Sequence, residues 1–231
     1  MSEAAGIPRF SKICLAIGFF FLYAPMVVLI VYSFNDSDRV NIWGGFSNRW
    51  YGELFRDEAM MSALWMSLRL AFASATASVV LGMLAALVLT RVRNFRSKTL
   101  FGGMVTAPLV MPDVIIGLSL LLLFVGMANT FGWPAQRGFL TIWIAHVTFC
   151  MAFVTVVLSS RLRELDKSLE EAAMDLGASR LGTFFYITLP IIAPALASGW
   201  LLAFTLSLDD LVIASFVAGP SSTTLPMVVF S

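Results

Sequence analysis

Long runs of apolar residues, separated by short polar stretches, make up most of the chain. A helix that crosses a bilayer needs roughly 20 predominantly apolar residues, and five runs reach that length. They are expected to form membrane-spanning helices over residues 13–34, 61–90, 99–128, 139–160 and 191–218. The apolar pattern therefore predicts an all-α polytopic membrane protein, a bundle of five to six transmembrane helices in a single domain, residues 1–231.

Basic residues between the runs set the expected orientation, because Lys and Arg are enriched in cytoplasmic loops. Ten of the 15 Lys and Arg residues fall on one side: before the first run, in the loop 91–98, and in the loop 161–190. The opposite side holds only Arg39, Arg49, Arg56 and Arg137. We therefore predict a cytoplasmic N-terminus, an external loop 35–60 and a cytoplasmic loop 161–190.

The loop 161–190 has the pattern of two short helices with a break between them. Ser168 and Glu171 have capping-box spacing, which predicts a helix that begins near Ser168. Gly177 suits the end of that helix, because glycine adopts a left-handed conformation without steric cost. A second helix is expected from Ser179, and Pro190 fits the first turn of the next long helix.

The same loop carries a longer spaced motif: Glu-Ala-Ala, three residues, Gly, nine residues, and Ile-x-Leu-Pro. This motif resembles the cytoplasmic-loop signature of permease subunits of binding-protein-dependent ABC importers. The resemblance implies a fold of the type I ABC importer permease and a coupling helix that docks into a groove on a cytoplasmic ATPase. The residues that it assigns to coupling are Glu171, Ala172, Ala173, Gly177, Ile187, Leu189 and Pro190. The alternative is an amphipathic helix that lies on the membrane surface.

Members of this family usually have a sixth span. The chain stops at residues 226–231, where another apolar segment begins. We therefore expect the sixth span to be missing after residue 231.

Ionisable residues inside the runs mark candidate functional positions, because each costs about 2.5–3.5 kcal/mol on insertion scales. The candidates are Arg69, Asp113, His146, Asp209 and Asp210. At ~1.5 Å per helical residue, all five are expected in the outer half of the bilayer, where they would form one polar chamber. Three acids against one permanent base leave that chamber negative, which favours a cationic substrate.

Each of these residues also has a structural interpretation. Arg69 is expected to form an ion pair with Asp209 or Asp210. His146 has an alternative role as a hydrogen-bonded residue of the bundle. Pro108 and Pro112 precede Asp113 and predict a broken helix, which is tolerated where a helix lines a cavity. Asp209, Asp210, Asp113 and His146 remain the candidate residues of the substrate pathway.

Two segments that contain these acids, residues 111–117 and 207–213, resemble the spermidine/putrescine branch of the same permeases. The resemblance favours putrescine over spermidine. It implies an assembly in the bacterial inner membrane with two copies of a cytoplasmic ATP-binding subunit, a second homologous permease and a periplasmic polyamine-binding protein. Membrane lipid and the polyamine itself complete the expected partners.

Composition excludes several other classes. Hydrophobic residues make up 59% of the chain and charged residues 13%, far below the quarter that is typical of soluble domains. A net charge of +1 gives no argument for nucleic acid. No Gly-x4-Gly-Lys-Ser/Thr phosphate loop occurs, and a single His offers no cluster of metal ligands. We therefore expect no catalytic, metal or cofactor site, and ATP hydrolysis by a partner subunit.

Two rival functions stay open from the sequence. One is an ion-coupled secondary transporter of a cationic solute, with Asp113 and the Asp209–Asp210 pair as ion sites. The other is an intramembrane enzyme, for which His146 and an aspartate would be the available chemistry.

Overall fold

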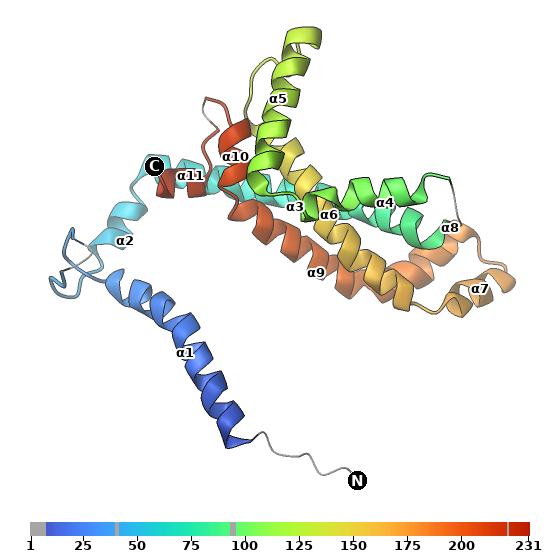
Figure 1. Ribbon diagram of the computed structural model, residues 1–231, viewed down its shortest axis with the longest axis horizontal. Helices are drawn as coiled ribbons and strands as arrows, with labels where there is room; N and C mark the ends of the chain where they lie inside the picture. The colour runs from blue at the N-terminus through green and yellow to red at the C-terminus, as the bar shows by residue number, and fades with distance from the viewer. Residues whose placement is uncertain (1–7, 40–41, 93–95, 221) are drawn as a thin grey trace. The chain divides into compact units, whose positions relative to one another are not determined.

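The computed structural model describes residues 8–39, 42–92, 96–220 and 222–231, and these residues form helices and connecting loops (Figure 1). Five helical stretches are long and apolar enough to cross a membrane. The expected all-α fold with about five spans is therefore confirmed. Arg93, one of the basic residues counted in the loop 91–98, lies outside the described residues.

Contacts group the chain into two compact units, residues 1–61 and 62–231. The expectation of a single transmembrane domain stays a prediction.

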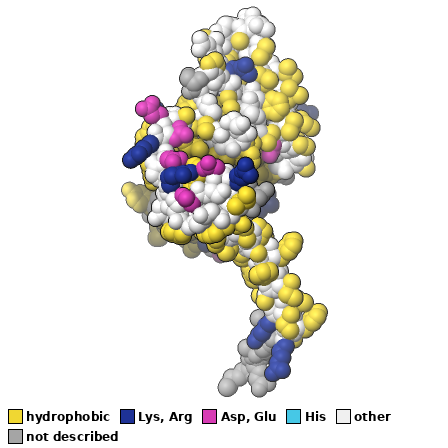
Figure 2. Space-filling view, turned by 90° about the vertical axis from the view of Figure 1, so that its left-hand side faces the viewer, with side chains coloured by type: hydrophobic (Ala, Val, Ile, Leu, Met, Phe, Trp, Pro, Cys, Tyr) yellow, Lys and Arg dark blue, Asp and Glu magenta, His cyan; other side chains and the backbone are white. Residues whose placement is uncertain are grey.

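The first unit contains α1 (Arg9–Tyr32), a loop and the short helix α2 (Arg49–Leu54). No α1 side chain is buried in the described structure. Figure 2 shows hydrophobic side chains along this helix, down to basic ones near its N-terminal end. A helix that is apolar on all sides is suited to lipid. Asn35 organises the loop behind α1: its side chain donates to the Ile42 carbonyl (2.7 Å) and accepts from the Gly44 amide (2.8 Å).

The second unit is built around α6 (Phe139–Glu164), which packs along α9 (Leu189–Leu208). The helix α3 (Glu58–Arg91) packs on α6 through small residues. Its buried positions include Ser67, Ser74, Ser78 and Gly82. A Cβ added at Gly82 would lie 2.8 Å from a methyl carbon of Val154 on α6, so the two backbones approach too closely for any larger residue. Small residues at helix contacts are the usual means of tight packing between membrane helices.

Three of the predicted spans correspond closely to single helices. The runs 13–34, 61–90 and 139–160 agree with α1, α3 and α6 to within a few residues at each end. The other two predicted spans are wrong in their bounds.

The predicted span 99–128 is not one helix. It divides into α4 (Lys98–Thr106), a 3-10 turn (Ala107–Leu109) and α5 (Asp113–Phe131). Proline has no N–H and clashes with the preceding turn, so Pro108 and Pro112 interrupt the helix as their positions predict. Asp113 is therefore the first residue of α5, and the depth estimated for it from a continuous helix does not hold.

The predicted span 191–218 begins and ends too late. The helical stretch begins at Arg180. The helix α8 (Arg180–Thr183) and a π-helical turn (Phe184–Thr188) lead without a break into α9. At the other end α9 stops at Leu208, and residues 212–217 form the separate helix α10 (Val212–Val217). The apolar pattern runs through this break, so only the two aspartates mark it in the sequence. A last short helix, α11 (Leu225–Val229), follows.

Candidate coupling loop and substrate pathway

The loop between α6 and α9 folds into two short helices, as its motif predicts. The first is α7 (Lys167–Asp175) and the second is α8. The predicted cap of α7 is wrong by two residues: Asp166, not Ser168, is the N-cap, and its carboxylate accepts from the Ser168 amide at 2.9 Å. This backbone hydrogen bond, with a further one from the Ser168 side chain, lowers the pKa of Asp166. A carboxylate at a helix N-terminus also complements the helix dipole.

Gly177 ends α7 in the conformation that the sequence predicts. Its φ is +92°, in the left-handed region, and a Cβ placed there would meet no atom within 4 Å. The Gly177 amide donates to the Met174 carbonyl (2.9 Å), and the Ala178 amide donates to the Ala173 carbonyl (3.0 Å). These two bonds make a Schellman motif. The geometry at Gly177 is thus set by the backbone and not by neighbouring side chains.

The second helix begins as expected. Ser179 is the N-cap of α8, and its hydroxyl accepts from the Gly182 amide at 3.1 Å. Pro190 lies in the first turn of α9, also as predicted. Leu189 packs against the hydrophobic core, whereas Ile187 is half-buried and Pro190 is exposed. The Ile-x-Leu-Pro motif therefore lies at the junction between the loop and the spanning helix α9.

Glu170 fixes α7 to the rest of the second unit, and sequence reasoning missed it. One of its carboxylate oxygens accepts from the Arg91 guanidinium at the end of α3 (3.0 Å) and from the Thr188 hydroxyl before α9 (2.8 Å). The Arg91 and Glu170 side chains are only 19% and 18% exposed. The neighbouring Glu171, which the motif singles out, is exposed and forms no ion pair with another described residue. A local signal for Glu170 is absent, because Arg91 and Thr188 are distant in sequence.

The loop 161–190, the candidate coupling loop, also exposes large apolar side chains. Leu176 is 91% exposed, Tyr186 83% and Leu181 73%. Ala172 is exposed as well, and Ala173 is half-buried. Exposed apolar side chains that gather in one segment mark a contact with another protein or with membrane.

We predict that Glu170→Ala destabilises the chain by about 1–3 kcal/mol, because Arg91 and Thr188 would lose their shared acceptor in a partly buried position. The melting temperature of the purified protein in detergent should fall by several degrees. Glu171→Ala is the matched control, since it removes an exposed carboxylate one residue away. Equal melting temperatures for the two variants would contradict the role given to Glu170.

A second group of polar residues joins α6 to the end of α9. His146 is 1% exposed. Its Nδ1 is 2.7 Å from the Ser207 hydroxyl and its Nε2 is 3.1 Å from a carboxylate oxygen of Asp210. The Asp210 carboxylate also accepts from the Ile213 and Ala214 amides, at 3.3 and 2.7 Å. Asp210 thus caps α10 and orients His146.

The remaining charged candidates lie apart from this group. Asp209 and Asp113 are exposed, at the end of α9 and the start of α5, and neither forms an ion pair with another described residue. Arg69 is exposed beside a cavity lined by Trp65, Phe72 and Phe204. The ion pair predicted for Arg69 with Asp209 or Asp210 does not form among the described residues, because Asp210 takes His146 as its partner.

Residues 78–230 match the family described as "Binding-protein-dependent transport system inner membrane component". The chain is 67% identical over 219 residues to the putrescine transport system permease protein PotI of Escherichia coli (strain K12), covering 95% of the chain and 78% of that protein. It is 42% identical over 211 residues to the spermidine/putrescine transport system permease protein PotC of the same strain, covering 91% and 77%.

Solved structures show the same fold. A bacterial ABC transporter involved in the import of the acidic polysaccharide alginate has a chain with a TM-score of 0.72 and 18% identity, covering 96% of this chain and 77% of that one. The family match covers more than half of the sequence and includes the whole coupling loop. The chain belongs to the family of binding-protein-dependent transport system inner membrane components.

Proposed function

We propose that this chain is the membrane-spanning translocation subunit of an ATP-driven polyamine importer, with putrescine preferred to spermidine. The observation that carries the proposal is the difference in identity to the two E. coli permeases, 67% to PotI against 42% to PotC. The exposed carboxylates of Asp113 and Asp209 support a cationic substrate. A desolvated ammonium group needs anionic or aromatic partners.

The coupling loop is the proposed contact with a cytoplasmic ATPase. Leu176, Leu181 and Tyr186 would insert into the partner, because large apolar side chains at such exposure gain most from burial. Movement of α7 would then pass to two spanning helices at once, since Glu170 binds Arg91 of α3 and Thr188 at the start of α9. In this proposal ATP hydrolysis belongs to the partner, and this chain is not an enzyme.

The proposed assembly contains two copies of the ATPase, a second homologous permease and a periplasmic polyamine-binding protein. The N-terminus and the coupling loop face the cytoplasm in this arrangement, as the distribution of Lys and Arg favours. The binding protein would release the polyamine on the opposite side. Closure of the ATPases would rock the bundle outward, and hydrolysis would return the pathway to the inside.

The test is uptake of labelled putrescine into proteoliposomes that contain the whole assembly, with loaded binding protein outside and ATP inside. We expect uptake that requires ATP and persists after ionophores collapse all ion gradients. Uptake that follows an ion gradient and ignores ATP would instead support the secondary transporter. An excess of unlabelled spermidine should compete less well than unlabelled putrescine.

A further inference from the structure

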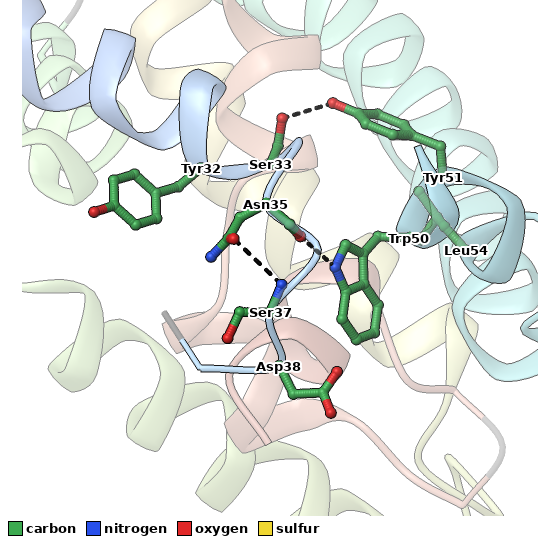
Figure 3. Close-up of a pocket in the computed structure, with 8 residues that line it drawn as sticks. All are labelled: Tyr32, Ser33, Asn35, Ser37, Asp38, Trp50, Tyr51 and Leu54. Atoms are coloured by element: carbon green, nitrogen blue, oxygen red, sulfur yellow. Dashed lines mark hydrogen bonds between the residues drawn. The ribbon is translucent and has the colours of Figure 1, made fainter. Parts of the chain in front are cut away.

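The end of α1, the loop that follows it and α2 line an open cavity of about 420 Å³ within the first unit. The residues that line it include Tyr32, Trp50 and Tyr51, together with Asp38 (Figure 3). Aromatic faces with one carboxylate are the groups that recognise an ammonium ion.

Most other polar groups of the wall already have partners. Trp50 donates its indole N–H to the Asn35 carbonyl (2.8 Å), and the Tyr51 hydroxyl is hydrogen-bonded to the Ser33 hydroxyl (2.8 Å). The Asn35 side-chain oxygen accepts from the Ser37 amide at 3.2 Å. The first two of these bonds hold the Trp50 and Tyr51 side chains, as Figure 3 shows. The Asp38 carboxylate is paired with Arg49 but is 80% exposed, so it keeps acceptor capacity for a ligand.

The chain itself places a cation against this wall. The Arg49 guanidinium carbon lies 4.3 Å from the centroid of the Trp50 ring, and Nη2 lies 2.8 Å from an Asp38 oxygen. Arg49 also approaches Glu53 at 3.3 Å. Trp50 and Asp38 therefore already bind a positive group together, and Arg49 would compete with a ligand for both.

We propose that this cavity, which is lined by residues of the first unit, is a binding site for the primary ammonium group of a linear aliphatic amine. The proposal rests on the proposed function only in choosing the diamine putrescine as the ligand. One ammonium group would bind to the Asp38 carboxylate and the Trp50 ring, the two groups that now hold the Arg49 guanidinium.

The experiment measures putrescine binding by equilibrium dialysis to the full chain in nanodiscs of uncharged lipid, without ATPase or binding protein. Asp38→Asn should weaken binding about tenfold, through loss of a charge-assisted hydrogen bond. Trp50→Leu should weaken it about threefold, through loss of a cation–π contact. Asp36→Asn, which removes an exposed carboxylate outside the cavity lining, should change nothing.

Arg49→Gln gives the opposite sign and separates a binding role from a structural one. Removing the built-in competitor should tighten putrescine binding, whereas Arg56→Gln removes the same charge from an exposed position and should leave binding unchanged. Circular dichroism shows whether each variant is folded.

Equal binding to the Asp38→Asn and Asp36→Asn proteins would overturn the proposal, and so would weaker binding to Arg49→Gln. Absence of binding to the unaltered chain would overturn it as well. None of these results touches the proposed function, which is read from ATP-driven uptake. If ATP-driven uptake fails while the variants bind putrescine as expected, the polyamine importer is rejected and the amine site is supported.

Discussion

Replacing Gly177 by proline is expected to abolish ATP-driven uptake while the chain still inserts into the membrane. Gly177 has a φ of +92° and donates its amide to Met174. Proline fixes φ near −65° and has no N–H, so it allows neither feature. It also disfavours a helical conformation at Leu176, the most exposed apolar residue of the loop. The turn between α7 and α8 would change its conformation, and Leu176 would leave the position in which it is proposed to contact the ATPase.

The matched control is Gly177→Ala. A Cβ at this position meets no atom within 4 Å, and the amide that binds Met174 is kept. The alanine variant then suffers only left-handed backbone strain, about 1–3 kcal/mol. We expect partial uptake from Gly177→Ala and none from Gly177→Pro, at equal amounts of protein in the membrane. Full uptake and normal copurification of the ATPase with Gly177→Pro would reject the coupling role of this loop.

The spanning helices could be predicted where apolar length alone decides the structure. The helices α3 and α6 contain no proline, and α1 runs unbroken through Pro25. The chemistry of proline predicts a break at Pro108 and Pro112, whereas apolar length alone predicts one continuous span over the same residues. The sequence does not predict the break after Leu208, because the residues on both sides are apolar. The physical cause of the break is the capping of α10 by the Asp210 carboxylate.

The coupling loop could be predicted better than its attachment. Backbone rules for glycine, serine and proline are local, so the ends of α7 and α8 follow from short stretches of sequence. The bonds from Glu170 to Arg91 and Thr188 join positions 79 and 18 residues apart. Periodicity contains no information on which of two adjacent glutamates makes them. The same limit applies to the small residues of α3, whose contact with Val154 depends on the packing of two helices.

The two adjacent aspartates are expected to separate into a structural residue and a transport residue. The Asp210 carboxylate accepts from His146 and from the Ile213 and Ala214 amides, and its side chain is 8% exposed. Its removal in Asp210→Ala would leave these donors without an acceptor, at about 1–3 kcal/mol for each buried group. We expect a large loss of yield and of melting temperature in detergent.

Asp209→Asn should leave stability unchanged and impair transport. Asp209 is exposed and forms no ion pair among the described residues, so asparagine keeps its size at little cost in stability. The variant should be produced and should assemble with the ATPase normally, yet its uptake of putrescine should fall sharply. The physical reason is that a dicationic substrate, stripped of water in the pathway, loses a carboxylate partner.

Asp113→Asn tests the second exposed acid, and the double variant with Asp209→Asn tests whether the two act together. Loaded binding protein should still dock on each variant, because docking precedes entry into the pathway. Uptake that survives neutralisation at Asp113 and Asp209, singly and together, would mean that no exposed acid of the spans meets the substrate. The polyamine would then have to pass on aromatic and carbonyl contacts alone, and the negative chamber predicted from the sequence would be wrong.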